Sequence, residues 1–384
     1  MKYVRLKDIT TKITKGTTPS NIGTSFTDEG INYFRSEMLG KSKYLDKSSG
    51  MMYISESTHN KLKRSQINPG DILFSMAGIY LGKLAIVQEE DVPANTNQAV
   101  ALIRFDRNVN IDYLYYFMSQ RSFNSYVNCM SAQAAQPNIN LKQIGNLQIA
   151  LPTDKQQKKI ADILSVYDNL IENNKKRIKL LEQMAENLYK EWFVRFRFPG
   201  YEDVELENGL PKGWEYTKLE RLANISTGKC NREDAEEDGA YPLFDRSQEI
   251  KRSNVWLKDC EAIIVPGEGT SFIPRYYNGK FNLHQRCYCV EPLEKGMGFF
   301  LYQTLMMYRI YFLYVATGAT VPSLRLNNFK NFKVLLPKKE LCFQYNEIAE
   351  KMNDEILLLK NKNELLAKQR DMLLPRLMSG KLEV

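Results

Sequence analysis

The chain has 384 residues, of which 43% are hydrophobic, and its 53 Lys and Arg against 45 Asp and Glu give a formal net charge of +8. This length suffices for two or three domains with apolar cores, and no run approaches the roughly 20 apolar residues of a transmembrane helix. The opening MKYVRLKDIT lacks the apolar segment of a signal peptide, so we expect a folded cytoplasmic protein. The basic excess is compatible with a polyanionic partner without requiring one.

The six cysteines lack the paired spacing of a disulfide framework or a zinc ribbon, so we expect reduced thiols. One stretch, HQRCYC, brings His284, Cys287 and Cys289 close together in sequence. It offers no fourth ligand, and alternating residues of a strand point to opposite faces. We therefore expect no metal site there.

Residues 1–152 are predicted to form a block of mixed α and β structure. Short β-rich runs such as DILFSMAG, KLAIVQ and AVALIRF alternate with Gly, Pro and Asn turns. An aromatic segment of helical character, IDYLYYFMSQRSFNSYV, follows these runs. The block closes with QPNINLKQIGNLQIALP, from Gln136 to Pro152.

Residues 153–198 are predicted to be mainly one long helix. The segment TDKQQKKIADILSVYDNLIENNKKRIKLLEQMAENLYKEWF contains no Pro or Gly, and its apolar residues recur in alternating steps of four and three. Such a heptad pattern is typical of a helix that packs along its length on another helix. A helix of about 40 residues is roughly 60 Å long, at about 1.5 Å per residue.

Residues 199–337 repeat features of the first block. The stretch VPSLRLNNFKNFKVLLP, from Val321 to Pro337, matches the apolar positions of QPNINLKQIGNLQIALP at a constant offset of 185, as from Pro137 to Pro322. The starts LKDITTKITKG and LERLANISTG are also alike. The loops differ sharply, and two copies of one frame with different loops are expected to recognise two different things.

Residues 338–384 are predicted to form a second long helix and a tail. The offset of 185 places this helix in the heptad register of the first, so the chain supplies both partners of an antiparallel pair. Flush helix ends would place Asn174 opposite Asn363, and a buried Asn pair fixes register at some cost in stability. Two separate core helices in two domains are the alternative. The predicted seam consists of Ile160, Leu164, Tyr167, Ile171, Asn174, Ile178, Leu181, Leu188, Met352, Ile356, Leu359, Asn363, Leu366 and Leu373.

The fold class expected from these elements is α/β (α+β). Two mixed α/β domains are joined by two long helices that pack as an antiparallel coiled coil, with a pseudo-twofold internal repeat.

The sequence offers little to a catalyst. Its only histidines are His59 and His284, so we expect neither a histidine-based catalytic triad nor a multi-histidine metal site. GIYLGKL is one residue short of a phosphate-binding loop and has Leu84 where Ser or Thr would hold magnesium. PGEGTSF is not a dinucleotide-binding loop, and the Asn/Asp-Pro-Pro-aromatic motif of amino-methyltransferases is missing. We expect no catalytic residues and no cofactor in this chain.

The loops instead carry polar side chains beside glycines. Arg pairs with guanine, Asn and Gln pair with adenine, and Ser, Thr and backbone amides hold phosphates, so these loops are candidate DNA contacts. The candidates are Lys15, Thr17, Thr18, Ser20, Arg35, Ser36, Ser75, Tyr80, Lys83, Asn97, Gln98, Gln133, Gln136, Lys229, Arg232, Arg246, Thr270, Ser271, Arg275, His284, Arg286, Thr320 and Ser323. Arg246, Arg275, Arg286 and Gln98 are the residues expected to read bases.

With both repeats and both helices in place, the chain resembles the specificity subunit of type I restriction-modification systems. The matching motifs, in order, are KITKGTTPS, GDILFSMAG, NQAVALIRF, INLKQIGNLQIALPTDKQQKKIADILSVYDNLI, LYKEWFVRFRFPGYE and LLPRLMSGKLEV. The family usually has a Glu-Gln pair after the Leu-Pro, whereas this chain has KQQ from Lys155 to Gln157 and ELCFQ from Glu340 to Gln344.

The resemblance implies two target-recognition domains, residues 1–152 and 199–337, each reading one half of a bipartite, asymmetric site in double-stranded DNA. It implies that the helices, residues 153–198 and 338–384, set the gap between the half-sites. Two methyltransferase subunits would dock on this chain, with restriction subunits in the full complex. The S-adenosylmethionine, ATP and Mg²⁺ chemistry would belong to those partners.

Two other classes of function compete with this one. An enzyme with an unrecognised site is disfavoured by the missing motifs. A coiled-coil scaffold that binds only protein accounts for the helices, but not for two loop-bearing domains with a basic excess.

Overall fold

The computed structural model describes residues 2–40, 42–106, 108–131, 137–318 and 320–382. The chain forms two compact units: Met1–Lys175 with Lys360–Val384, and Lys176–Leu359. Each long helix contributes to both units, whereas the four-part division expected from the sequence separates helices from blocks, and that division stays a prediction. Within the described ranges, no helix combines the length and the apolar content needed to cross a membrane.

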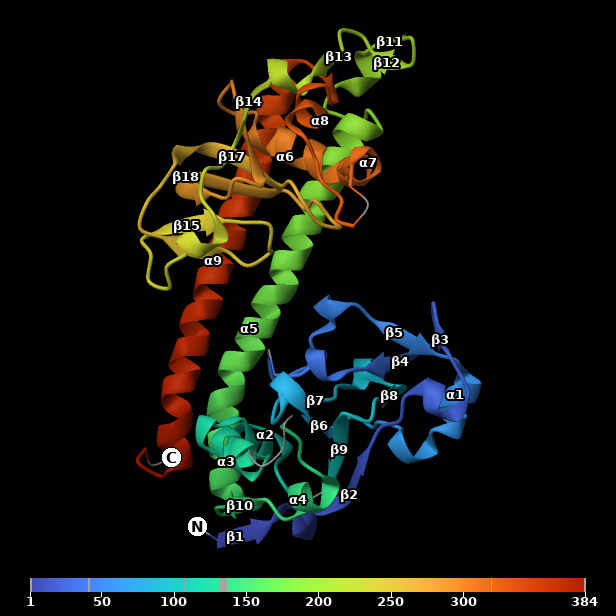
Figure 1. Ribbon diagram of the computed structural model, residues 1–384, viewed down its shortest axis with the longest axis vertical. Helices are drawn as coiled ribbons and strands as arrows, with labels where there is room; N and C mark the ends of the chain where they lie inside the picture. Colours follow the sequence, from blue (N-terminus) through green and yellow to red (C-terminus); the bar gives the residue numbers. More distant parts are fainter. Residues whose placement is uncertain (1, 41, 107, 132–136, 319, 383–384) are drawn as a thin grey trace. The chain divides into compact units, whose positions relative to one another are not determined.

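The first unit contains two four-stranded sheets, with strand orders β2-β9-β6-β7 and β3-β5-β4-β8 (Figure 1). The strands of the first are β2 (Thr10–Lys15), β6 (Ile72–Ser75), β7 (Leu84–Ile86) and β9 (Val100–Phe105). Those of the second are β3 (Phe26–Thr27), β4 (Ile31–Phe34), β5 (Met52–Ile54) and β8 (Ala94–Thr96), and the short helix α1 (Glu56–Lys61) follows β5. Strands β6, β7 and β9 coincide with the three β-rich runs of the sequence, so those predictions are confirmed.

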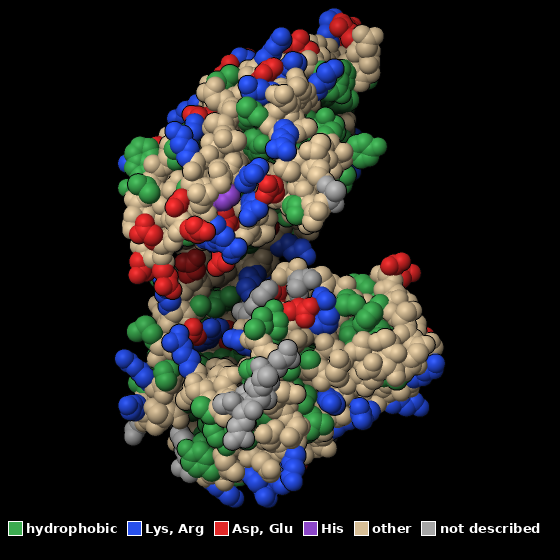
Figure 2. Space-filling model, viewed as in Figure 1, with side chains coloured by type: hydrophobic (Ala, Val, Ile, Leu, Met, Phe, Trp, Pro, Cys, Tyr) green, Lys and Arg blue, Asp and Glu red, His purple; other side chains and the backbone are tan. Residues whose placement is uncertain are grey.

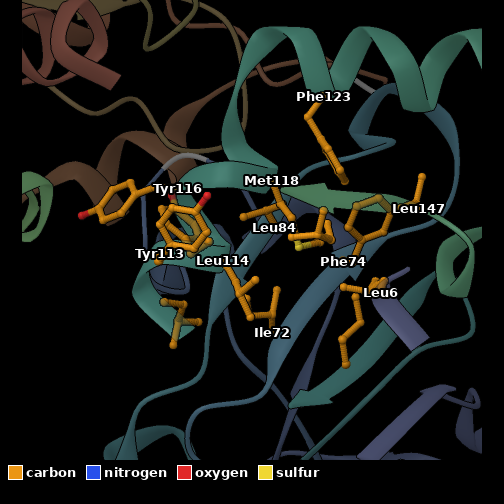
Figure 3. Close-up of a cluster of buried hydrophobic side chains, with 14 of the residues drawn as sticks. Leu6, Ile72, Phe74, Leu84, Tyr113, Leu114, Tyr116, Met118, Phe123 and Leu147 are labelled. Carbon is orange, nitrogen blue, oxygen red and sulfur yellow. The ribbon is translucent and has the colours of Figure 1, made fainter. Parts of the chain in front are cut away.

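The aromatic segment after these strands is helical, as predicted, but it is two helices rather than one. Helix α2 (Ile111–Ser119) ends at Gln120, whose backbone is extended, and α3 (Arg121–Ser131) follows at once. Figure 3 shows side chains of α2 packed on those of β6 and β7 in the core of this unit. The labelled residues from these three elements are Tyr113, Leu114, Tyr116 and Met118, with Ile72, Phe74 and Leu84.

The closing motif of the first block is a short helix and a strand. Helix α4 (Leu141–Gly145) is capped by Asn140 and Gln143, whose side chains each accept a hydrogen bond from the other's backbone N–H at 2.9 Å. Strand β10 (Gln148–Leu151) then pairs antiparallel with β1 (Lys2–Arg5). The strand ends directly before Pro152; Ile149 and Ala150 are buried in the core, and Leu151 packs against it half-buried.

In the first unit, the early part of α5 (Asp154–Tyr189) lies against the late part of α9 (Lys339–Met378). The carboxylate of Asp168, which is only 5% exposed, accepts hydrogen bonds from Arg370 of α9 and from the hydroxyl of Tyr116 of α2. Leu164 and Leu377 belong to the same apolar core as the sheet. One buried carboxylate therefore ties both helices to the domain.

The second unit is built on a six-stranded sheet with the order β14-β19-β17-β18-β15-β16. Its strands are β14 (Ala223–Thr227), β15 (Tyr241–Phe244), β16 (Lys251–Ser253), β17 (Lys258–Pro266), β18 (Arg275–Leu283) and β19 (Cys287–Pro292). The aromatic segment is again two helices, α6 (Gly298–Met307) and α7 (Arg309–Val315), which meet at Tyr308. The mixed α/β prediction is confirmed for both units.

The second block begins and closes like the first. After a small hairpin of β11 (Leu206–Glu207) and β12 (Leu210–Pro211), strand β13 (Glu215–Lys218) pairs antiparallel with β20 (Lys333–Leu336). Helix α8 (Leu326–Lys330) precedes β20, as α4 precedes β10. The strand again ends just before the proline.

In the second unit, the two helices are joined by an aromatic cluster. Tyr189 ends α5, and a π-helical turn (Lys190–Val194) follows, so the prediction of helix to residue 198 extends too far. The ring centroid of Phe193 lies 5.3 Å from that of Tyr345 on α9, and the Tyr345 hydroxyl donates to the Ala185 carbonyl at 3.1 Å. These aromatic residues sit in the main core of the second unit.

All fourteen predicted seam residues are buried or half-buried. Within the first unit, Asn174 Nδ2 donates to Asn363 Oδ1 at 2.8 Å, the pairing that the shared heptad register predicts. Within the second, Arg177 Nη2 lies 2.8 Å from Glu355 Oε1. A continuous coiled-coil seam nevertheless stays a prediction.

Replacing Asp168 with Ala is expected to lower the free energy of unfolding by about 3 kcal/mol, because a buried hydroxyl loses its acceptor and the half-buried guanidinium of Arg370 is left with Asp371. Urea unfolding followed by far-UV circular dichroism measures this. Glu347→Ala removes a fully exposed ion pair on α9 and should leave the unfolding curve unchanged. Equal curves for the two variants would contradict the role given to Asp168.

Candidate nucleic-acid interface

Five loop segments of the second unit meet at one end of its sheet, and they contain Lys229, Phe244, Gly267, His284 and Pro322. The turn between β18 and β19 is their centre: Lys229 N donates to Leu283 O at 3.0 Å, and His284 N donates to Phe244 O at 3.0 Å. On its other side, Gly267 N donates to Arg286 O at 2.7 Å. Segments remote in sequence are thereby fixed beside one another by their backbones.

Glycine makes this convergence possible. A Cβ atom on Gly228 would lie 1.9 Å from the carbonyl oxygen of Leu283, where no side chain fits. In the first unit, a Cβ on Gly16 would lie 1.8 Å from the carbonyl oxygen of Thr96. The residues that directly follow β2 and β14 therefore lie in close backbone contact with the ends of β8 and β18.

The first unit has a matching set of backbone hydrogen bonds between its loops, and we call this shared set the loop frame. Met76 N donates to Ala99 O at 2.8 Å, as Gly267 N does to Arg286 O. The next two contacts also match: Ile139 N donates to Met76 O and Gly78 N to Pro137 O, as Leu324 N donates to Gly267 O and Gly269 N to Pro322 O. Ala77 and Ala99 of the first unit thus stand where the second has Glu268 and Arg286.

A pocket with a volume of about 280 Å³ opens in the loop cluster of the second unit, and it is lined by Arg232, Asp245, Arg246, Ser247, Glu268, Gly269, His284 and Val321. Figure 2 shows basic and acidic side chains interspersed on the face of this unit. Within the pocket, Arg246 Nη1 lies 2.5 Å from one oxygen of the Glu268 carboxylate, and Arg286 Nε lies 3.5 Å from the other. One carboxylate thus accepts a hydrogen bond from Arg246 and lies within ion-pair distance of Arg286, and both guanidinium groups are partly exposed.

The remaining charged groups of the pocket are fixed by burial and hydrogen bonds. Burial, together with the positive charge of Arg246, lowers the pKa of His284. Its Nδ1 accepts a hydrogen bond from Arg286 N at 3.0 Å, so the neutral ring carries its proton on Nε2. Burial alone would raise the pKa of Asp245, but hydrogen bonds from Lys251 and Ser247 lower it to about 2. Asp245 is therefore an anion in the lining of the pocket at neutral pH.

Arg275 does not lie where the sequence-based prediction requires. Its guanidinium donates to the carbonyl oxygens of Ser247 at 2.9 Å and Asp245 at 2.6 Å, and it packs 5.1 Å from the ring centroid of Phe244. Burial lowers the pKa of Arg275. The side chain supports a loop from inside, which disagrees with the base contact predicted for it.

Ser75 is also at odds with the predicted DNA contacts. The residue is completely buried in β6, and its hydroxyl has no hydrogen-bond partner among the described residues. Its position within the core of the first unit keeps it from any surface contact.

The other candidates divide by exposure. Lys15, Ser20, Lys83, Gln98, Lys229, Arg232, Arg246, Thr270, Ser271, Arg286 and Thr320 are exposed. Thr17, Thr18, Arg35, Ser36, Tyr80, Asn97 and Ser323 are half-buried, and His284 is buried but lines the pocket. Gln133 and Gln136 lie outside the described residues. The DNA contacts of all these residues stay predictions.

Some residues of the interface were missed by the sequence analysis. Glu268 is acidic and was not expected on a DNA-facing surface, although it lies in the loop PGEGTSF. A groove in the first unit, with a volume of about 350 Å³, is lined by Lys7, Lys12 and Lys142 among other residues. Because these lysines come from distant segments, no local sequence pattern identifies them as a cluster.

Comparison with known proteins agrees with this architecture. A family model described as "Type I restriction modification DNA specificity domain" matches residues 1–183 and 211–368. The chain belongs to this family. Each of the two matches includes one loop frame and the first part of the long helix that follows it.

Among curated members of the type I specificity family, the MjaIX specificity subunit of Methanocaldococcus jannaschii is 26% identical over 406 residues, covering 99% of this chain and 93% of the relative. The EcoDI specificity subunit of Escherichia coli is 33% identical over 144 residues, covering 38% of this chain and 31% of the relative. A crystal structure of a type I restriction-modification S subunit from M. genitalium has a TM-score of 0.60 at 16% identity, covering 98% of this chain and 95% of that chain. The last likeness is one of fold.

Replacing Arg275 with Ala is expected to lower the free energy of unfolding of the second unit by about 2–3 kcal/mol, because two partly buried carbonyl groups lose a charged donor. Fluorescence-detected urea unfolding reports on this unit, since Trp192, Trp214 and Trp256 all belong to it. Arg286→Ala is the control and should leave the transition in place, because its side chain is 52% exposed. An unfolding transition of Arg275→Ala that matches the transition of the unchanged protein would contradict the supporting role of Arg275.

Proposed function

We propose that this chain is the DNA-specificity subunit of a type I restriction-modification complex, and that each unit reads one half of a bipartite, asymmetric DNA site. The observation that carries the proposal is the loop frame that occurs in both units with different side chains. Loops held on a fixed frame are where proteins place their recognition residues. The membership of the type I specificity family supports the same function.

The two loop clusters are suited to different base sequences. The turn that carries Gln98 and Ala99 in the first unit carries Gln285 and Arg286 in the second. The glutamine is common to both turns, so the difference lies at the next position. There the second unit has a guanidinium, which presents donors alone and pairs with guanine, and the first has an alanine. Different side chains on one frame therefore favour two unlike half-sites.

We further propose that α5 and α9 form an antiparallel coiled coil that sets the gap between the half-sites, within a pseudo-twofold repeat. Contacts inside each unit support this pairing. Residue numbers rise along α5 as they fall along α9, from Asp168 with Arg370 to Asn174 with Asn363 in the first unit. In the second, Arg177 pairs with Glu355.

The partners proposed for this chain are two methyltransferase subunits, with restriction subunits in the full complex. The helices carry exposed apolar side chains that a docked protein could cover. These are Val166, Leu170, Leu180, Met184, Leu357, Leu358, Leu365 and Met372. Methylation with S-adenosylmethionine and cleavage with ATP and Mg²⁺ would be carried out by the partners, so this chain acts without catalysis or a cofactor of its own.

A coiled-coil scaffold without DNA readout is the other candidate function. It explains the helices and their exposed apolar residues. It gives no reason for two loop frames with different polar side chains, and no observation favours it over the DNA-binding function.

The proposal is tested by expressing the chain with its methyltransferase partner and mapping the methylated adenines in the DNA of the cells. A bipartite motif with a fixed gap is expected. Gln98→Ala should relax one half and Arg246→Ala the other, each by about 1–3 kcal/mol of base discrimination. Methylation without a fixed motif, or both halves changing in one variant, would reject it.

Inserting one heptad into each helix, after Asn174 and before Asn363, should lengthen the gap in the methylated motif. Heptad insertion preserves the side-chain register of both helices, so the loop clusters are left intact and both half-sites should be unchanged. Lys179→Gln, a change of an exposed residue on α5 outside that apolar set, serves as the control and should leave the gap as it is. Changed half-sites with an unchanged gap would contradict the role of the helices.

A further inference from the structure

An acidic residue occupies the centre of the candidate interface in the second unit. Glu268 weakens the attraction of this surface for phosphates, since DNA is a polyanion. Its side chain is only 18% exposed, and it contacts both Arg246 and Arg286. A carboxylate in this place is useful if it orients the two guanidinium groups.

We infer that Glu268 is a positioning residue that directs Arg286 and Arg246 to guanine, so that the half-site read by the second unit contains a G·C base pair. The inference rests on the proposed function and specifies the base that this one loop cluster selects.

The contacts with Glu268 use one side of each guanidinium group and leave a pair of N–H donors on the other side, as guanine requires. Arg286 meets Glu268 through Nε, so its Nη1 and Nη2 groups form the outer edge. Two parallel N–H donors match O6 and N7 of guanine in the major groove. Arg246 meets the same carboxylate through Nη1, which leaves its Nε and Nη2 groups for another acceptor.

Fixing the guanidinium also creates discrimination against adenine. Adenine presents an amino group where guanine presents O6, so a fixed guanidinium would place donor against donor. An arginine without a carboxylate neighbour can swing to a phosphate, which carries no sequence information. Glu268 therefore favours base readout over phosphate binding.

The backbone holds the carboxylate and Arg286 in one rigid arrangement. Gly267 N donates to Arg286 O at 2.7 Å, so the residue before Glu268 is bonded to the residue that Glu268 orients. Gly269, which follows it, has φ of +127° and donates to Pro322 O at 3.1 Å. Glu268 thus lies between two glycines. Gly267 leaves no space for a side chain beside Arg286 O, and Gly269 has a backbone conformation that favours glycine.

The first unit has the same frame without the ion pairs. Ala77 bridges to Asn138 as Glu268 bridges to Ser323, and Met76 N donates to Ala99 O where Gly267 N donates to Arg286 O. Alanine at both positions offers neither carboxylate nor guanidinium. The first unit therefore lacks this carboxylate–guanidinium pair, and we expect other side chains to read its half-site.

The decisive variant is Glu268→Gln in the full chain, expressed with its methyltransferase partner. Methylation mapping should show guanine preference falling by about 5- to 150-fold at one position of one half-site, the equivalent of about 1–3 kcal/mol. The other half-site and the gap should be unchanged. Binding of the purified complex to DNA without the motif should become tighter, because one negative charge is lost.

Two further variants separate positioning from folding. Arg286→Lys keeps the charge but loses the planar pair of donors, so it should relax the same guanine position without weakening binding to unrelated DNA. Glu291→Gln removes the partner of Lys258 at an ion pair elsewhere in the unit, and it should leave the motif unchanged.

The inference is overturned if the half-site altered by Arg246→Ala contains no G·C pair, or if Glu268→Gln weakens binding to all sequences alike. Either result would leave the bipartite motif, and with it the proposed function, in place. Methylation without any bipartite motif would instead overturn the proposed function, and the inference with it.

Discussion

At one place in each unit, two backbones pass so close to one another that no side chain fits between them. Gly16 meets the carbonyl of Thr96, and Gly228 meets that of Leu283. Each contact fixes the residue after one strand, β2 or β14, against the end of another strand, β8 or β18, that comes much later in the chain. The loops of the candidate interface are then held by further backbone hydrogen bonds, so the exposed side chains that they carry can differ without moving the frame. This independence lets one frame present two different sets of polar groups.

The elements of the fold could be predicted largely from sequence, since they rest on local patterns. The β-rich runs became β6, β7 and β9, and both closing strands end at the residue before a proline, which cannot continue a ladder. The breaks within the aromatic helices were not predicted. At Gln120 and Tyr308 the composition still favours a helix, yet the backbone of both residues leaves the helical conformation.

The candidate site was less predictable, because the sequence shows residue types but not their partners. Arg275 looks like a DNA contact by its chemistry, yet its donors are used by two carbonyl groups inside the domain. Ser75 lies beside a glycine loop in sequence but within a fully buried strand. The role of Glu268 depends on two arginines that are 22 residues before it and 18 after it, and only the folded loops bring the three together.

The division of the long helices between the units has a consequence for synthesis on the ribosome. The second unit is one continuous segment, Lys176–Leu359, and can fold as soon as that segment has emerged. The first unit includes residues from Lys360 onward, and its core counts Leu377 and Met378 among its members. Although most of this unit is translated first, its core is complete only after the second unit has been made. Until then its part of α5 exposes an apolar stripe, a state that a chaperone or a partner subunit would have to cover.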